Sequence, residues 1–157
     1  MEDKLKILVV SDSHGREERV NKLLSSEDFD YFFFLGDGLK DLGTMIEHPN
    51  TVAVRGNCDF FSRHDDTAVI EMAGVKFLLT HGDRFHVKST LIPLIDEAKY
   101  RGVDVVFYGH THRFNDETID DIRYINCPSL HKSHDGKPKY LMVEIEDKKI
   151  SISCKDF

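Results

Sequence analysis

The sequence predicts an α/β protein in which mixed sheets are layered with helices. Three observations support this fold class. Short β-branched or aromatic runs end at Asp, His or Asn beside Gly, segments of helical periodicity lie between them, and the C-terminal part is rich in alternating strands. Such an order is typical of layered α/β folds. The chain has 157 residues, so we expect one domain, residues 1–157, with a sizeable core.

The first third of the chain alternates strand and helix patterns. Short runs rich in β-branched or aromatic residues predict buried strands at Leu5–Val10, Tyr31–Leu35 and Thr51–Val54. Apolar residues at helical spacing predict helices over Arg16–Leu24 and Leu39–Glu47. Each strand is therefore followed by a polar segment that contains a glycine.

The middle of the chain predicts a loop, a hairpin, a helix and a strand. Residues 60–66 are polar and aromatic and indicate a loop. Gly74 lies between two strand patterns and predicts the hairpin turn, and Gly102 marks the end of a helix. The expected elements are strands Ala68–Met72 and Val75–Thr80, helix Thr90–Arg101 and strand Val103–Phe107.

The C-terminal part changes character, because its apolar residues alternate as in antiparallel strands. The expected strands are Phe114–Ile119, Ile122–Ile125, Tyr140–Ile145 and Ile150–Cys154. We find no internal repeat or linker.

Composition narrows the possible settings and partners. The net charge of −7 and the lack of a basic tract argue against a nucleic-acid scaffold, although a short nucleotide could still be a substrate. Three widely spaced cysteines, Cys58, Cys127 and Cys154, favour a reducing compartment over a disulfide framework. No apolar run approaches the length of a membrane span or a signal-peptide core, so we expect a cytoplasmic protein.

Five predicted strands end in side chains that can bind metal ions. In open α/β folds, ligands bind beyond the carboxyl ends of the strands. Imidazole and carboxylate ligands suit Mn, Fe, Co, Ni or Zn, whereas Ca and hydrated Mg fit less readily. Seven candidates are about right for two ions that share one carboxylate. They are Asp12, His14, Asp37, Asn57, His81, His110 and His112.

Each candidate alone has a simpler explanation. Asp12 and Asp37 could cap helices, and Asn57 could be a turn residue. His110 and His112 could be structural histidines. The repetition of the pattern at five strand ends favours metal binding. Two ions roughly 3.5–4 Å apart can bind a phosphoryl group and lower the pKa of a bridging water, so that hydroxide attacks phosphorus in line.

The motif series resembles one protein family. Asp-x-His, Gly-Asp, Gly-Asn-x-Asp, His-Gly and Gly-His-x-His occur in this order between Asp12 and His112. They are similar to the motifs of the calcineurin-like metallophosphoesterase superfamily, and the spacing and length resemble its small stand-alone YfcE-type branch. The fold implied is a four-layer αββα sandwich, in which two mixed sheets are flanked by helices.

The resemblance also implies a role for each residue. Asp12, His14 and His112 would bind one divalent metal ion, and Asn57, His81 and His110 the other, with Asp37 bridging the two. Manganese is the expected metal, with Ni, Fe, Co, Zn or Mg as alternatives. The residues implied in catalysis are Asp37, Asn57, His81, Cys58 and Asp59.

Cys58 departs from the wider superfamily, in which a histidine at this position is assigned to protonating the leaving group. Asp59 would orient that histidine and here lacks its usual partner. General-acid catalysis is typically worth about 10²–10⁴-fold. Its absence favours phosphodiesters, or esters with acidic leaving groups, over broad monoester hydrolysis. Asp83 is a second departure, because many relatives have histidine there.

The resemblance implies a metal-dependent phosphodiesterase that acts on a small phosphodiester or other phosphate ester. Two alternatives remain. One is a phosphomonoesterase, nucleotidase or other phosphatase that uses the same centre. The other is a non-catalytic scaffold like the retromer subunit of similar fold, which has lost parts of its metal site. Relatives often form homo-oligomers, but no apolar stripe in this sequence identifies an interface.

Overall fold

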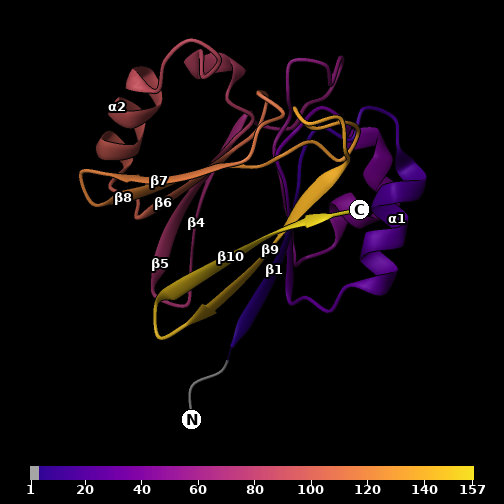
Figure 1. Ribbon diagram of the computed structural model, residues 1–157, viewed down its shortest axis with the longest axis horizontal. Coiled ribbons are helices and arrows are strands. Elements are labelled where there is room, and N and C mark those ends of the chain that lie inside the picture. The colour runs from indigo at the N-terminus through magenta and orange to yellow at the C-terminus, as the bar shows by residue number, and fades with distance from the viewer. Residues whose placement is uncertain (1–3) are drawn as a thin grey trace.

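The computed structural model describes residues 4–157, which build two five-stranded sheets (Figure 1). The first sheet has the order β10-β9-β1-β2-β3 and the second the order β4-β5-β6-β8-β7. The strands are β1 (Leu5–Val10), β2 (Tyr31–Phe34), β3 (Thr51–Ala53), β4 (Thr67–Met72), β5 (Val75–Thr80), β6 (Val105–Tyr108), β7 (Asn115–Ile119), β8 (Ile122–Asn126), β9 (Lys139–Glu146) and β10 (Lys149–Asp156).

Helices cover the outer faces of the two sheets. Helix α1 (Glu17–Ser26) and the 3₁₀ segment η1 (Leu39–Glu47) pack on the first sheet, and α2 (Ile92–Arg101) and the short η2 (Asp83–Phe85) pack on the second. Figure 1 shows α1 and α2 on opposite sides of the molecule. The predicted four-layer αββα sandwich of two mixed sheets is therefore confirmed.

The alternation of side chains along the strands produces these layers. In β1, Ile7 and Val9 point into the core between the sheets, whereas Leu8 and Val10 point toward α1. All four are fully buried, because β1 is covered on both faces. Between the sheets, the Phe33 ring packs edge-on against Phe77 and Phe107. This continuous core holds the two sheets together.

The segment Leu39–Glu47 differs from the predicted regular helix. It is a 3₁₀ segment that is interrupted at Gly43, where φ is 55° and ψ is −133°. The apolar spacing was recognised correctly, because Leu39 and Leu42 are buried. The glycine conformation that breaks the helix leaves no signal in the apolar pattern.

Several smaller predictions are confirmed with shifted boundaries. Ala73 and Gly74 both have positive φ and form the predicted hairpin turn. Gly102 ends α2 in a left-handed conformation, and α2 begins two residues later than predicted. Strand β8 pairs antiparallel with β7, as its pattern indicates, and it also pairs parallel with β6. None of the helices within residues 4–157 is both long and apolar enough to span a bilayer.

Candidate metal centre

The carboxyl ends of four central strands bring six predicted ligands together. Strands β1 and β2 are parallel neighbours in the first sheet, and β5 and β6 are parallel neighbours in the second. The residues that follow them are Asp12 and His14, Asp37, His81, and His110 and His112, respectively. Two hydrogen bonds connect the sheets at this edge, from His81 Nδ1 to Leu35 O at 2.8 Å and from His110 N to Asp12 Oδ2 at 3.1 Å.

Asp12 is the centre of the first cluster. Its side chain is fully buried, and its Oδ1 lies 3.2 Å from His112 Nε2 and 3.5 Å from His14 Nε2. The potential ligand atoms of these three residues all lie within 4.8 Å of one another. Ser11 donates a hydrogen bond to the other oxygen, Oδ2, at 2.6 Å. Oδ1 therefore faces two imidazoles, and a metal ion could be bound by all three side chains.

Asp37 is the centre of the second cluster and also contacts the first. Its Oδ2 lies 3.2 Å from His81 Nε2 and 3.8 Å from His14 Nε2. Asp37, His81 and His110 form one group of potential ligands within 4.8 Å, and Asp37 forms another with His14 and Cys58. Asp37 is thus grouped with His14 of one predicted metal site and with His81 and His110 of the other. Its position therefore fits the predicted bridge.

The charges of the two carboxylates fit a bound cation. Asp12 and Asp37 are almost completely buried, and within residues 4–157 their only ion-pair partners are histidines. Burying two carboxylates without a lysine or arginine partner costs free energy of folding, unless a cation compensates their negative charge. Imidazole nitrogens and carboxylate oxygens are suitable ligands for Mn, Fe, Co, Ni and Zn. The donor set therefore fits divalent metal ions.

Protons on the histidines can compensate part of this negative charge. Burial alone would raise the pKa of Asp12, but hydrogen bonds from His112 and His14 outweigh it and hold the pKa well below its ordinary value. Burial would lower the pKa of His81, but the hydrogen bond to Asp37 and the charge of Asp12 raise it to about 9. A metal ion must displace the His81 proton, so metal binding should weaken as the pH falls.

His81 is held in the orientation that metal binding requires. Its Nδ1 lies 2.8 Å from Leu35 O, and because a carbonyl only accepts, Nδ1 must carry a proton. That leaves Nε2 facing Asp37 and His110 Nδ1, which lies 3.2 Å away. A metal-binding histidine usually donates its second ring N–H to an oxygen in this way.

The backbone at the strand ends is strained. Positive φ angles occur at five of the seven predicted ligands: Asp12, His14, Asp37, His110 and His112. Such angles are uncommon outside glycine, and strained residues tend to cluster at functional sites. The strain turns successive side chains toward one point.

Two glycines leave room for the buried carboxylates. A Cβ atom at Gly56 would lie 2.2 Å from Asp37 Oδ1, and one at Gly109 would lie 2.9 Å from Asp12 Oδ2 and 2.2 Å from Ser11 Oγ. All three contacts are too short for a side chain at either position. The glycines beside the predicted ligands therefore allow close approach of the backbone.

Asn57 and Cys58 lie at the exposed rim of the site, in the loop that follows β3. The Cys58 backbone N–H donates to Asp37 Oδ1 at 2.7 Å, and Asn57 Nδ2 lies 3.6 Å from Cys58 Sγ. Burial, Asp37 and Asp59 raise the pKa of the Cys58 thiol, so it is protonated and uncharged at neutral pH. Metal binding by Asn57 stays a prediction.

Asp59 connects the Asn57 loop to the Asp37 loop through the backbone. Its carboxylate accepts four hydrogen bonds of 2.8–3.0 Å, from the N–H groups of Asp37, Gly38, Leu39 and Gly56. Its oxygens are therefore occupied by the backbone instead of facing the side chain of residue 58. This geometry indicates that Asp59 positions the two loops, and its part in catalysis stays a prediction.

Sequence reasoning missed two further positioning residues. Asp41 is buried and accepts hydrogen bonds from Ser13 Oγ at 2.6 Å and Gly15 N at 2.9 Å, which fixes the His14 loop. Ser129 is also buried and donates to Asp12 O at 2.8 Å. Asp41 was read as part of a regular helix. Ser129 lies outside every predicted strand, helix and motif.

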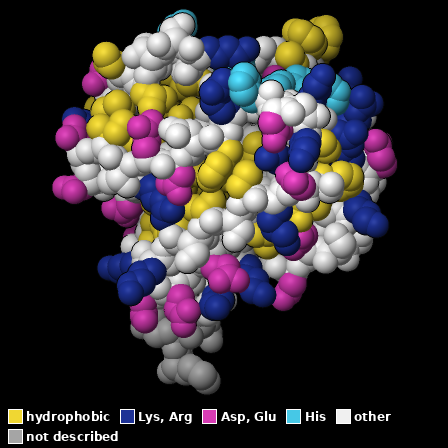
Figure 2. Space-filling model, in the orientation of Figure 1, with side chains coloured by type: hydrophobic (Ala, Val, Ile, Leu, Met, Phe, Trp, Pro, Cys, Tyr) yellow, Lys and Arg dark blue, Asp and Glu magenta, His cyan; other side chains and the backbone are white. Residues whose placement is uncertain are grey.

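Two arginines, Arg16 and Arg113, lie at the rim of the centre, although the whole chain is acidic. His131 N donates to Asp12 O at 3.1 Å, and His134 N donates to His112 O at 2.7 Å, so both histidines lie beside the site instead of on a remote surface. Arg16 contacts the His131 ring, and Arg113 the His134 ring. Figure 2 shows histidines gathered at one end of the molecule among Lys and Arg side chains. A local positive field attracts anionic ligands.

The comparison with known protein families decides the assignment. The family model of the calcineurin-like phosphoesterase superfamily domain matches residues 5–148, which include every strand-end motif. The chain belongs to this superfamily.

Individual phosphoesterase relatives agree over most of the chain. A probable metallophosphoesterase of Mycoplasma pneumoniae is 32% identical over 151 residues, which cover 93% of each chain. A protein of Methanocaldococcus jannaschii named as a phosphodiesterase is 28% identical and aligns with 78% of this chain and 82% of its own. A predicted phosphoesterase structure from Streptococcus pneumoniae superposes with a TM-score of 0.88 at 26% identity, covering 98% of this chain and 90% of its own. The fold and the metal-dependent phosphoesterase family are thus shown, and the sequence resemblance is confirmed.

Proposed function

We propose that this chain hydrolyses phosphodiesters with the help of two divalent metal ions. The observation that carries the proposal is the pair of buried carboxylates, Asp12 and Asp37, each in its own histidine cluster. Among the described residues, both form ion pairs with histidines alone and with no Lys or Arg. Such an arrangement supports two adjacent positive charges. The archaeal relative that is named as a phosphodiesterase supports the diester assignment.

The ligand assignment follows the two clusters. Asp12, His14 and His112 would hold one ion, Asn57, His81 and His110 would hold the other, and Asp37 would contact both. When bound, the ions would supply positive charge to the phosphoryl group and lower the pKa of a water molecule. Manganese is the first metal to test, followed by Ni, Fe, Co, Zn and Mg.

Residues around the metal centre would attract the anionic substrate and would not repel it. Arg16 and Arg113 lie at the rim, where they can attract an anionic ester. Cys58 carries no charge that would repel the phosphate, but a thiol with a raised pKa is a weak proton donor. We therefore expect acidic leaving groups to be favoured.

Hydrolysis of bis-p-nitrophenyl phosphate tests the proposal. Folded protein should be inactive after chelation and should regain turnover when Mn²⁺ is added. The diester should be hydrolysed faster than p-nitrophenyl phosphate. A faster monoester reaction would favour the phosphomonoesterase alternative. No turnover with any of the six metals would contradict the proposal and favour the scaffold alternative.

A Cys58→His variant tests the account of the leaving group. An imidazole is a better proton donor to the leaving group than the Cys58 thiol. Diphenyl phosphate has the poorer leaving group of the two diesters, so its hydrolysis should rise about tenfold. Hydrolysis of bis-p-nitrophenyl phosphate should change much less. Rates on the two diesters give the measurement, with Cys58→Ser as the control for volume. An unchanged ratio of the two rates would show that residue 58 does not limit protonation.

A further inference from the structure

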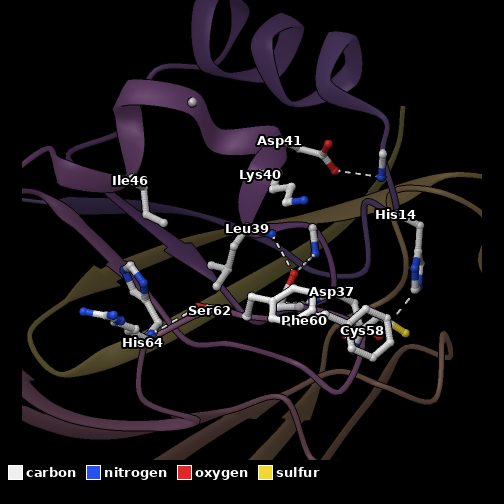
Figure 3. A pocket seen from close by; sticks show the side chains of 16 residues that line it. His14, Asp37, Leu39, Lys40, Asp41, Ile46, Cys58, Phe60, Ser62 and His64 are labelled. Carbon is white, nitrogen blue, oxygen red and sulfur yellow. Dashed lines mark hydrogen bonds and ion pairs between the residues drawn. The ribbon is translucent and has the colours of Figure 1, made fainter.

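A cleft of about 860 Å³ opens beside the candidate metal centre (Figure 3). Its inner end is formed by His14, Asp37 and Cys58, which also form one of the groups of potential metal ligands. From there it runs between the η1 segment and the loop of residues 60–64. The cleft is therefore continuous with the metal centre. A substrate whose phosphorus lies at the centre can place an ester substituent directly in the cleft.

The walls of the cleft are aromatic and aliphatic. Leu39 and Ile46 line one side, and Phe60 and Phe61 line the other. The Phe60 side chain is 70% exposed, and Phe61 is fully exposed. Single exposed apolar residues are common, but two adjacent phenyl rings at the mouth of a polar site are not explained by packing. Figure 3 shows the labelled Phe60, Asp37 and Cys58 side chains in the same part of the cleft.

The backbone of Phe61 is strained, because its φ is 66°. A positive φ is an outlier for a bulky side chain, and strained residues concentrate at sites that bind ligands. Phe61 is not buried, so its side chain contributes little to the stability of the fold. The strained backbone and the exposed side chain therefore indicate that Phe61 has a functional role.

Two cations also line the cleft. Lys40 and Arg63 have no carboxylate within 4 Å among residues 4–157, so both are available to a ligand. Three acidic residues line the cleft. Asp37 belongs to the metal centre, whereas Asp41 and Asp59 direct their carboxylates to backbone N–H groups and, for Asp41, also to a serine hydroxyl. Away from the metal centre, the free charge in the cleft is therefore positive.

We propose that this cleft holds the nucleobase of a nucleotide phosphodiester, stacked on Phe60 and Phe61, while Lys40 and Arg63 attract a neighbouring phosphate. Every nucleobase presents a planar face that can stack on a phenyl ring, so the cleft would accept different bases. Its volume is in the usual range for small-molecule sites. This inference rests on the proposed function, because it requires the phosphorus to lie at the metal centre.

Equilibrium binding to the Mn²⁺-loaded protein tests the inference. Isothermal titration calorimetry should show AMP binding about tenfold more tightly than ribose 5-phosphate, because both present the same phosphate and only AMP carries a base. The double variant Phe60→Ala/Phe61→Ala should remove this difference and leave the affinity for ribose 5-phosphate unchanged. Tyr100→Ala removes an aromatic side chain of α2 that is 84% exposed and lies outside the cleft, so it should keep the preference.

Two results would overturn the inference. The first is equal affinity for AMP and ribose 5-phosphate, or a preference that survives in the double variant. The second is a dimer in sedimentation experiments that dissociates in the double variant and not with AMP, because the phenyl rings would then contact a second copy of the chain. Turnover of bis-p-nitrophenyl phosphate, measured on the same protein, separates the two proposals: turnover without an AMP preference overturns the inference alone, and an AMP preference without turnover overturns the proposed function.

Discussion

The Asp37→Asn variant should lose at least about 100-fold in kcat/KM on bis-p-nitrophenyl phosphate. Residues that only orient a metal ligand typically contribute 10–100-fold, so a ligand shared by two ions should contribute more. Asp37 Oδ2 lies 3.2 Å from His81 Nε2 and 3.8 Å from His14 Nε2, and these two residues belong to different predicted metal sites. The substitution preserves the shape of the side chain and removes its charge. Steady-state kinetics with saturating Mn²⁺ would measure the loss.

Asp65→Asn is the matched control, because Asp65 is exposed and lies outside both ligand clusters. It makes the same change of charge and should retain activity close to that of the wild type. If Asp37→Asn kept more than about a tenth of the wild-type kcat/KM, Asp37 could not be a shared ligand.

The Asp59→Asn variant should be less stable by about 2–6 kcal/mol and should bind metal more weakly. The carboxylate accepts four backbone hydrogen bonds from the two loops that carry Asp37 and Asn57. An amide would direct its NH₂ group at two of these donors, and each unsatisfied donor costs about 1–3 kcal/mol. The loops would separate, so metal affinity should fall about 10–100-fold. Urea unfolding of the metal-free protein and Mn²⁺ titration would give the two values.

Asp121→Asn is the control for this variant, because Asp121 is an exposed turn residue with positive φ, a conformation that asparagine tolerates. It should leave the free energy of unfolding within about 0.5 kcal/mol of the wild type. If Asp59→Asn were equally stable and bound Mn²⁺ equally well, the four hydrogen bonds would not be holding the loops together.

The polar residues at the strand ends could be predicted because they directly follow an apolar run in the sequence. The apolar run Leu5–Val10 predicts a buried strand, and the polar residues after it must then lie at the edge of a sheet. The motif series predicted which strand ends meet, and the structure brings Asp12 and His112 together across 100 residues. Single strands alone could not have shown this contact, because apolar patterns do not specify which strands are neighbours.

The supporting residues could not be predicted, because their partners are backbone atoms far away in the sequence. Ser129 donates to the carbonyl of Asp12, and Asp59 accepts from residues 37–39. Neither pairing leaves a pattern in the chain. The Phe60–Phe61 pair was read only as part of a loop, since exposure and the neighbouring metal centre become visible only in three dimensions. Cytoplasmic location, a single domain over residues 1–157 and homo-oligomer formation stay predictions.

The metal content of the purified protein tests the central claim most directly. After exposure to excess Mn²⁺ and removal of free ions, plasma mass spectrometry should find two ions per wild-type chain and no more than one per Asp37→Asn chain. The buried carboxylates and their two histidine clusters predict this difference. A wild-type protein that binds one ion or none, or an Asp37→Asn variant that binds two, would contradict the account of a centre in which Asp37 lies between two metals.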